Sequence, residues 1–246
     1  MDSGQGDLEF KTEVLILARL QHNNLVRLLG FSIQGNERLL VYEFVQYGSL
    51  DHFLFDGSVN SSTLNWDTRY KIILGIAKGL VYLHEDSRLR IVHRDLKASN
   101  VLLDGNMIPK IADFGLAKLV LRDATQETSR IIGTYGYMAP EYANHGCFSF
   151  KSDMYSFGVV VLEIVSGQKR FQNGATPRDL LNIAWRNWQE RTSANIIDPF
   201  LMVTSGGAQP EMLKCIQIAL LCVQENPGDR PTVASVVQML STSSSL

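Results

Sequence analysis

Hydrophobic positions near the N-terminus first follow a helical period and then a strand-like pattern. Apolar residues recur at helical spacing through residues 7–20, which predicts a first helix. Residues 25–33 and 39–45 are rich in strand formers, and the polar segment 34–37 between them predicts a turn, so we expect an antiparallel hairpin. The apolar positions that predict the first helix are Leu8, Val14, Leu15, Leu17 and Ala18.

The remainder of the chain is predicted to be mainly helical. Residues 47–49 break the pattern before a short helix at 50–55, and the small polar residues of 57–63 predict a loop. A long helix is expected from residue 67, whereas residues 91–138 are rich in loops and carry only short apolar runs. Later helices are predicted at 151–166, 180–191, 211–224 and 232–240.

This order of elements predicts an α+β chain with two lobes. A small mixed lobe, 1–46, is followed by a large and mostly helical lobe, 47–240, with the joint between them at 42–49. The polar tail 241–246 is expected to be disordered.

Composition limits the classes of function. The chain has 246 residues, 45% of them hydrophobic, so it can bury a sizeable core, and its net charge of −2 gives no general attraction to nucleic acid or to an anionic membrane. The N-terminus lacks the pattern of a signal peptide, and the most apolar stretch, 158–165, is too short to span a bilayer. We therefore expect a soluble chain. Its three cysteines, expected to be buried intracellular thiols without disulfide or metal, are Cys147, Cys215 and Cys222.

Three motifs that carry chemistry follow one another in a fixed order. Residues 93–100 read His-Arg-Asp-Leu-Lys-Ala-Ser-Asn and match H-R-D-L-x-x-x-N at every specified position. Asp-Phe-Gly follows at 113–115, and Ala-Pro-Glu at 139–141. A single three-letter match occurs by chance in many proteins, but the ordered set behind an eight-residue motif is highly specific.

These motifs make the chain resemble the catalytic domain of eukaryotic protein kinases. The strings LQHNNLVRLLGF, RLLVYEF, IVHRDLKASNVLLD, KIADFGLAK and GTYGYMAPEY are similar to those of plant receptor-like kinases, and within these to the cysteine-rich branch. The resemblance covers residues 4–240. It implies a two-lobed protein-kinase-like fold, ATP and Mg²⁺ as cofactors, and transfer of phosphoryl groups to protein serine or threonine hydroxyls.

The resemblance implies a catalytic role for five residues. Asp95 would accept or orient the substrate hydroxyl, Lys97 would meet the transferring phosphoryl group, and Thr134 would brace both. Asn100 and Asp113 would supply oxygens to Mg²⁺. Taken singly, an Asp or Asn in a loop is more often a helix cap or turn residue, and only the joint motif set favours catalysis.

Nucleotide-binding residues are implied on both sides of the joint. Tyr42 would lie at the back of the adenine pocket, with main-chain groups of Glu43 and Val45 at the adenine edge and Leu102 below. Glu13 occupies the place of the glutamate that pairs with the nucleotide-binding lysine, and its alternative is a solvated surface carboxylate.

Other positions are implied to regulate or to support the site. Arg94 would bind a phosphate on the activation segment, 113–141, where Thr128 and Ser129 are favoured over Thr125 and Thr134 as acceptors. The alternative is that these threonines and this serine are ordinary polar residues of a loop without a regulatory role. Three residues are expected to be structural, with Asp153 anchoring the catalytic loop and Glu141 pairing with Arg230.

Two parts of a kinase are missing from the sequence. No G-x-G-x-x-G-x-V lid and no V-A-I-K-like lysine strand precede the first helix, and Lys11 cannot share a face with Glu13 because they are two residues apart. We expect an N-terminally truncated small lobe, weak nucleotide binding and negligible activity of the chain alone. The alternatives to an enzyme are a pseudokinase-like scaffold and a truncated gene product.

The expected protein partners and the location follow from the resemblance, whereas charge and hydropathy argue against nucleic acid and a membrane segment. Protein substrates are expected, with receptors or other kinases as further candidates, and neither nucleic acid nor a membrane segment of this chain is expected. The predicted location is cytoplasmic, which for the family means the cytosolic side of the plasma membrane.

Overall fold

Helix α5 (Phe150–Ser166) forms the centre of the hydrophobic core. Its residues from Ser152 to Ser166 are all buried, and the helix begins at a capping box made by Ser149 and Ser152 and ends at Gly167, whose φ of 65° is left-handed. In this computed structural model, α5 packs against α8 (Gln209–Cys222). The residues that the structure describes are 3–56, 64–120, 126–172, 178–205 and 207–242.

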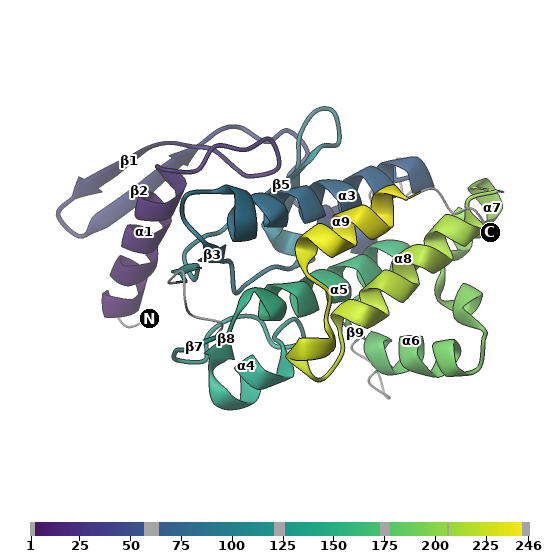
Figure 1. Cartoon of the computed structure of the whole chain (residues 1–246). Helices are drawn as coiled ribbons and strands as arrows, with labels where there is room; N and C mark the ends of the chain where they lie inside the picture. Colours follow the sequence, from purple (N-terminus) through teal and green to yellow (C-terminus); the bar gives the residue numbers. More distant parts are fainter. Residues whose placement is uncertain (1–2, 57–63, 121–125, 173–177, 206, 243–246) are drawn as a thin grey trace.

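Further helices surround α5 and form the large lobe. Helix α3 (Trp66–Val81) contacts both α5 and α9 (Val233–Ser241), and in Figure 1 α9 lies between α3 and α8. Helix α3 begins at Asn65, whose side chain accepts a hydrogen bond from the Thr68 amide, and continues into a π-helical turn, η2 (Tyr82–Asp86). The smaller helices are α2 (Leu50–Phe55), α4 (Pro140–His145), α6 (Leu180–Gln189) and α7 (Pro199–Thr204), with 3₁₀ turns η3 (Ala98–Asn100), η4 (Ser193–Ile196) and η5 (Pro227–Asp229).

The strands of the large lobe are short and pair two by two in antiparallel fashion. The pairs are β3 (Ile91–Val92) with β6 (Lys118–Leu119), β4 (Val101–Leu103) with β5 (Pro109–Ile111), β7 (Glu127–Thr128) with β8 (Cys147–Phe148), and β9 (Phe171–Gln172) with β10 (Arg178–Asp179).

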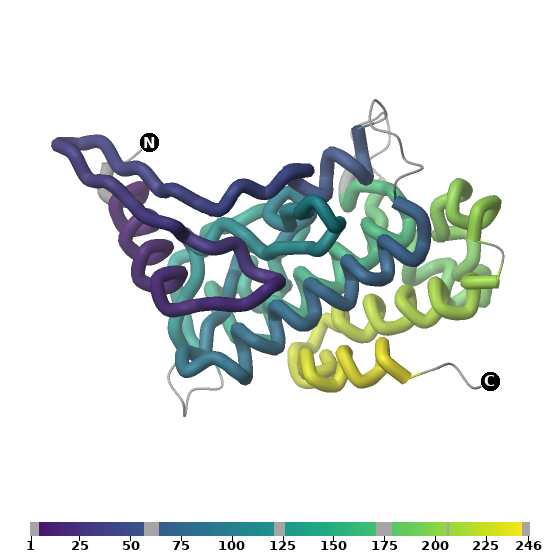
Figure 2. The backbone as a smooth tube through the Cα atoms, turned by 90° about the horizontal axis from the view of Figure 1, so that it is seen from above, coloured from purple at the N-terminus to yellow at the C-terminus, as the bar shows by residue number. Residues whose placement is uncertain are grey.

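The N-terminal part consists of one helix and one hairpin. Helix α1 (Ser3–Leu17) packs on strands β1 (Leu28–Gln34) and β2 (Glu37–Tyr42), with the rings of Phe10 and Phe31 in an edge-to-face contact at 6.1 Å. Figure 2 shows this unit at one end of the molecule and the C-terminal helices at the other. The hairpin turns at Gly35, where a φ of 57° favours glycine.

Main-chain hydrogen bonds connect the N-terminal part to the β4–β5 pair. The Val26 amide donates to the Ile111 carbonyl at 2.9 Å, and the Ile111 amide donates to the main-chain carbonyl of Asn24 at 2.9 Å. On the other side, the Tyr47 amide donates to the Leu103 carbonyl, and the Leu103 amide donates to the Gly48 carbonyl. The joint between the lobes is therefore fixed by backbone pairing on two sides of the same hairpin.

The predicted α+β class with two lobes and a mostly helical second lobe is confirmed, and so are the hairpin and the main helices. The boundaries at 46 and 240 stay predictions. Helix α9 includes Ser241, one residue into the predicted tail, whereas 243–246 and the predicted loop 57–63 lie outside the described residues.

Two details of the sequence prediction are wrong. The apolar positions that predicted α1 do not share one buried face, because Leu17 is buried but Leu8 and Leu15 are 53% and 61% exposed, while Phe10 and Ile16 are buried instead. A helix that packs on a narrow hairpin and a loop at once does not follow one simple apolar stripe. Cys147 is half-buried rather than buried, whereas Cys215 and Cys222 are buried as predicted.

Candidate active site

The catalytic loop is held by one buried carboxylate. Asp153 lies in the first turn of α5 and is fully buried, and its oxygens accept hydrogen bonds from the amides of His93 (2.8 Å) and Arg94 (2.9 Å). His84 Nε2 lies 2.9 Å from the same carboxylate. Burial opposes ionisation, but these hydrogen bonds outweigh it and lower the pKa of Asp153. This anchor fixes Arg94 in the left-handed region, with φ 71°.

The anchored loop presents Asp95 at the start of the cleft. Asp95 Oδ1 accepts hydrogen bonds from Thr134 Oγ1 (2.7 Å) and from the Thr134 amide (3.0 Å), while Oδ2 lies 2.7 Å from Lys97 Nζ. Lys97 Nζ also donates to Thr134 Oγ1 at 2.9 Å. Burial raises the pKa of Asp95, but the bonds from Lys97 and Thr134 outweigh it, so the pKa is lowered. Asp95 is therefore an ionised acceptor.

Asn100 connects Asp95 to Asp113. Its amide nitrogen lies 2.9 Å from the Asp95 carbonyl, 3.2 Å from Asp95 Oδ2 and 3.4 Å from Asp113 Oδ2. Asp113 has a positive φ of 65°, which turns its side chain back toward the catalytic loop. The three side chains predicted to bind metal and hydroxyl thus lie together.

The chemistry of these donors fits Mg²⁺. The Asn100 side-chain oxygen accepts no hydrogen bond from a described residue, so an amide oxygen and the Asp113 carboxylate remain for a hard cation. Within the described ranges no cluster of three or more His, Cys, Asp or Glu could hold a metal. Mg²⁺ commonly takes only one or two carboxylates and completes its shell with substrate phosphates and water.

A cavity of about 410 Å³ opens beside Asp113 between the hairpin and the β4–β5 pair. All five residues predicted to bind nucleotide line it, and the structure adds three that the sequence analysis missed, namely Val26, Phe44 and Ala112. Ala112 could have been found from its position directly before Asp113. The predicted set that lines this cavity is Glu13, Tyr42, Glu43, Val45 and Leu102.

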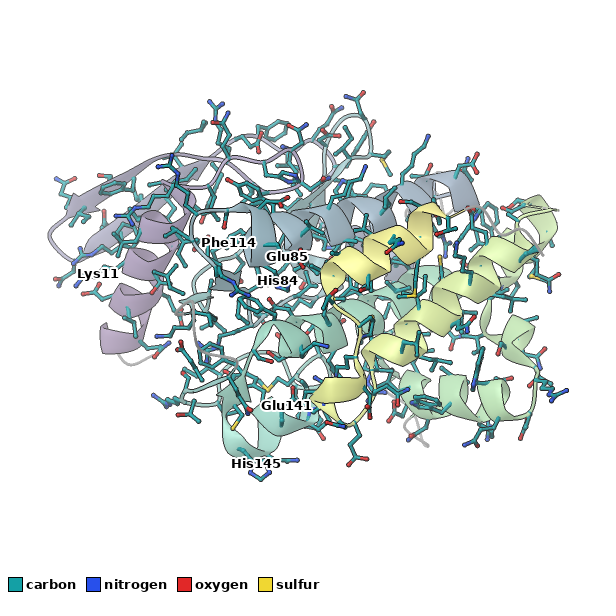
Figure 3. The ribbon with its side chains drawn as sticks, viewed as in Figure 1. Lys11, His84, Glu85, Phe114, Glu141 and His145 are labelled. Carbon is teal, nitrogen blue, oxygen red and sulfur yellow. The ribbon has the colours of Figure 1, made fainter. Side chains whose placement is uncertain are left out.

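Glu13 is buried, so its alternative as a solvated surface carboxylate is wrong. It is only 7% exposed, and its carboxylate accepts hydrogen bonds from the Phe114 amide (3.2 Å) and from the Tyr42 hydroxyl. Burial raises the pKa of Glu13. No described lysine or arginine forms an ion pair with it, and Figure 3 shows Lys11 on the opposite side of α1 from Phe114.

Arg94 reaches the activation segment. Its Nη2 donates to Ser129 Oγ at 3.2 Å and to the Arg130 carbonyl at 3.1 Å, and the guanidinium also bonds the Tyr142 hydroxyl. Its Nε is buried without a hydrogen-bond partner among the described residues. Thr128 is exposed in β7 and makes no hydrogen bond to Arg94, and the candidate Thr125 lies outside the described residues.

The predicted structural pair is present. Arg230 Nη1 and Nη2 bind Glu141 Oε1 and Oε2 at 2.7 and 2.8 Å, in a bidentate geometry, and the Arg230 side chain is fully buried. The pair joins the start of α4 to the turn before α9. Glu141 is labelled at this position in Figure 3.

Glu163 is a further buried carboxylate close to the site, and the motifs do not point to it. Glu163 in α5 accepts hydrogen bonds from the Tyr137 hydroxyl (2.9 Å to each oxygen) and from the Arg170 amide (2.8 Å). Burial raises the pKa of Glu163 to about 7 despite these bonds. The available signal was a single acidic residue inside an apolar helical run.

Comparison with known sequences defines the class of protein. A family profile described as protein tyrosine and serine/threonine kinase matches residues 2–240, and the chain belongs to this family. It is 58% identical to cysteine-rich receptor-like protein kinase 26 of Arabidopsis thaliana over 240 residues, which is 96% of the chain, and 58% identical to cysteine-rich receptor-like protein kinase 29 over 248 residues, or 98% of the chain.

The predicted kinase resemblance and its receptor-like branch are therefore confirmed. The chain spans about a third of the length of these relatives, 36% in each case. Protein kinases as a family use ATP and Mg²⁺ and act on proteins. Among the described residues, no helix combines the length and apolarity needed to cross a bilayer.

Proposed function

We propose that this chain carries the phosphoryl-transfer centre of a serine/threonine protein kinase that uses Mg²⁺ and ATP. The observation that carries the proposal is the continuous contact of Asp95, Asn100 and Asp113 beside a cavity lined by residues from both lobes. Ionised and amide oxygens that meet at a cleft suit a reaction that depends on positioning and on neutralising phosphate charge.

Each residue has one task in this proposal. Asp95 accepts the proton of the substrate hydroxyl or orients that hydroxyl, and Thr134 holds the carboxylate in place from both its amide and its hydroxyl. Lys97 offers a positive charge to the transferred group. Asp113 and Asn100 would hold Mg²⁺, which would neutralise phosphate charge when bound.

The edge of the adenine ring would form hydrogen bonds with main-chain groups at the joint between the two lobes. The Val45 amide and the Glu43 carbonyl make no hydrogen bond to a described residue, so one donor and one acceptor remain at the wall of the cavity. Leu102 supplies an apolar face, and Tyr42 closes the back of the cavity through its bond to Glu13.

Regulation by phosphate on the activation segment belongs to the same proposal. Ser129 is the better acceptor of the two favoured hydroxyls, because it already lies 3.2 Å from Arg94 Nη2. A phosphate there adds about −1.5 to −2 charge and would pair with the guanidinium. Thr128 would need the β7–β8 pairing to rearrange before it could reach Arg94.

The test uses two forms of the protein. The 246-residue chain, and the same chain preceded by the Gly-rich loop and lysine strand of a relative, are assayed with Mg²⁺ and ATP on a basic serine-rich protein. Asp95→Asn should lower transfer by about 10²–10⁴-fold, and Asp113→Ala should remove Mg²⁺-dependent binding of a fluorescent ATP analogue. Asp67→Asn, in the first turn of α3, is the control. No transfer by either form would contradict the proposal.

A second candidate function is a kinase-like scaffold that binds partners without turnover. It is favoured by one observation, the bonding of Glu13 to Tyr42 and Phe114 rather than to a described cation. Nucleotide binding without transfer in both forms would support it. Protein substrates, receptor or kinase partners and a place on the cytosolic side of the plasma membrane are proposals by analogy with the relatives, and a pull-down from membrane fractions tests them.

A further inference from the structure

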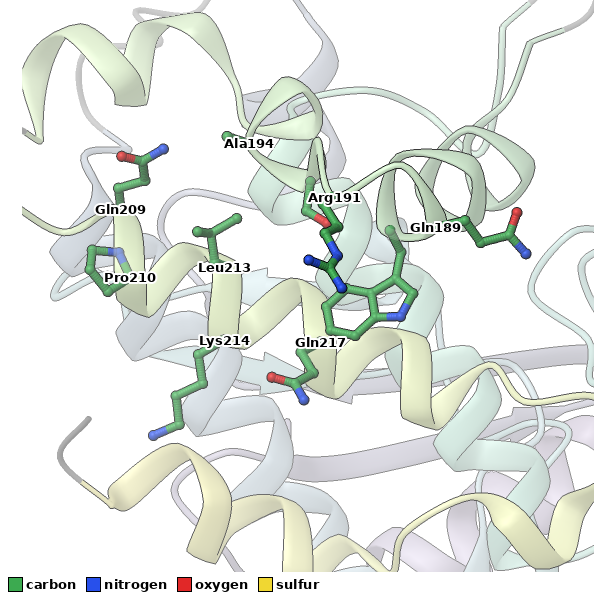
Figure 4. A pocket seen from close by; sticks show the side chains of 10 residues that line it. Gln189, Arg191, Ala194, Gln209, Pro210, Leu213, Lys214 and Gln217 are labelled. Atoms are coloured by element: carbon green, nitrogen blue, oxygen red, sulfur yellow. The ribbon is translucent and has the colours of Figure 1, made fainter. Parts of the chain in front are cut away.

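A second hollow, larger than the cleft, lies on the large lobe. Its volume is about 1,030 Å³, and it lies where the C-terminal end of α6 and the turn η4 meet the first turns of α8 (Figure 4). Figure 1 shows α6 and α8 on the opposite side of the molecule from α1 and the hairpin. No residue of the proposed catalytic centre lines this hollow, which we call the α6–α8 groove.

The floor of the α6–α8 groove is apolar and its rim is rich in amides. Trp188, Pro210 and Leu213 supply the apolar surface, and Trp188 is 41% exposed although tryptophan usually buries most of its area. The glutamines of the rim have no side-chain hydrogen bond to another described residue. These glutamines, which leave amide donors and acceptors free, are Gln189, Gln209 and Gln217.

The charged residues among the described lining of the α6–α8 groove are both basic. Arg191 and Lys214 line it, and none of its described lining residues is acidic. Glu211, on the same turn of α8 as its rim, points elsewhere and accepts a hydrogen bond from Trp66 Nε1. Lys214 is partly satisfied by the Thr242 carbonyl, whereas Arg191 has no side-chain hydrogen bond or ion pair with a described residue.

Arg191 ends helix α6 as the left-handed residue of a Schellman motif, in which the Arg191 amide donates to the Trp188 carbonyl (3.1 Å) and the Thr192 amide to the Asn187 carbonyl (2.8 Å). Its φ is 58°, in the left-handed region that glycine favours, so an arginine costs stability there. This conformation ends the turn after α6 and places the guanidinium on the groove, where Figure 4 shows it above Gln217.

We propose that the α6–α8 groove binds an extended segment of a partner protein that carries a large apolar side chain flanked by acidic residues. The apolar floor accepts the side chain, the free amides match the main-chain groups of an extended peptide, and the two cations attract the carboxylates. Tryptophan and arginine are also the residues that contribute most to protein interfaces. The proposal is independent of catalysis in the cleft.

A membrane surface is the less suitable occupant. Electrostatic binding to anionic lipid generally requires a cluster of about 4–8 basic residues on a convex or flat surface, whereas this groove is concave and has two. Free glutamine amides also gain less from lipid than from a peptide backbone. The groove therefore fits a protein segment better.

The test measures binding of two labelled, capped pentapeptides to the intact chain by fluorescence anisotropy. Both have phenylalanine at the centre, and one has aspartates and the other lysines on each side. We expect the acidic peptide to bind and the basic one not to bind. Arg191→Gly should weaken binding about tenfold or more, because a charge-assisted hydrogen bond is lost. The control Lys71→Gln, on the exposed side of α3, removes the same charge outside the groove and should change nothing.

Arg191→Gly also separates binding from folding. Glycine accepts a φ of 58° without strain, so this variant should unfold at a temperature no lower than the wild type while it binds less. Equal binding of the two peptides, or unchanged affinity of Arg191→Gly, would overturn the proposal. Binding to phosphatidylserine vesicles that depends on Arg191, without binding of the acidic peptide, would assign the groove to a membrane instead and would overturn it as well.

Discussion

Lys97 Nζ lies 2.7 Å from Asp95 Oδ2, so the cation that we propose to face the transferred phosphoryl group also pairs with the proposed base. The two residues are two apart in sequence and are brought together because the 3₁₀ turn η3 begins directly after Lys97. Thr134 Oγ1 bonds both of them, which places a residue of the activation segment between the charges. The position of that segment therefore decides the geometry of the base.

Lys97→Met tests this relationship. Loss of one charge-assisted hydrogen bond, about 1.5–3 kcal/mol, should lower the rate of phosphoryl transfer by roughly 10–100-fold. The variant should fold normally because the Lys97 side chain is partly exposed. The rate is measured as labelled phosphate transferred from ATP by the form that carries the added Gly-rich loop and lysine strand. Lys71→Met, a charge loss on the exposed side of α3, is the control, and an equal loss of rate in both variants would contradict the assignment.

Breaking the Glu141–Arg230 pair should strongly destabilise the large lobe. Glu141→Ala leaves the buried Arg230 guanidinium without its bidentate partner, and we expect a loss of about 3–5 kcal/mol in the free energy of unfolding. Urea denaturation followed by circular dichroism measures the loss. Asp7→Asn removes a partner of Arg38 in an exposed pair and should cost at most about 1 kcal/mol. Similar losses in the two variants would show that burial does not matter here.

Glu163 should make stability depend on pH. Burial raises its pKa from 4.5 to about 7, so between these values the folded chain holds a proton that the unfolded chain releases. The contribution of Glu163 to the free energy of unfolding therefore falls as pH rises through that interval. The total loss, reached at about pH 7, is on the order of 3 kcal/mol. The charged and titratable groups around it are Tyr137, Lys169 and Arg170.

Glu163→Gln should remove this dependence. Glutamine keeps an oxygen for the Tyr137 hydroxyl and cannot ionise, so we expect the variant to be more stable than the wild type at pH 8 and similar to it at pH 5. Urea denaturation at both pH values measures the effect. Glu225→Gln, at an exposed carboxylate, should leave the profile of the wild type unchanged. Parallel pH profiles of wild type and Glu163→Gln would exclude the mechanism.

Gly158→Ala should loosen the contact of α5 with α8. A Cβ at Gly158 would lie 2.8 Å from the Ala219 carbonyl oxygen and from Cys222 Cβ, which is closer than packed atoms allow. We expect a loss of about 1–3 kcal/mol in stability, although alanine is the better helix former. Thermal unfolding checks this. Gly30→Ala has open space around the new methyl group and should be neutral or stabilising.

Local sequence patterns predict the helices and strands of this chain more reliably than the faces that these elements bury. The hairpin, α2 and α5 were predicted within a few residues, because turn residues and apolar periods are local signals. The buried face of α1 was not, since Glu13 is buried and Leu15 is exposed. Hydropathy alone cannot predict that a carboxylate points inward to bond Tyr42 and Phe114.

In the candidate site, too, the sequence predicts some residues and gives no sign of others. The motifs identified Asp95, Asn100 and Asp113 because their spacing is specific, but the motifs contain no information about Glu163 or about Val26 and Phe44 at the cavity wall. The pairing of Glu141 with Arg230 was expected from resemblance, and its bidentate geometry comes from the turn η5 before α9.

By itself, the sequence determined the family, the order of the elements and the identity of the reactive groups, because each of these is written in local patterns and motifs. The tertiary structure decided which of these groups meet, which carboxylates are buried, and where a second groove forms. The physical reason is that burial and charge depend on neighbours distant in the chain, as for Asp153 and the amides of His93 and Arg94.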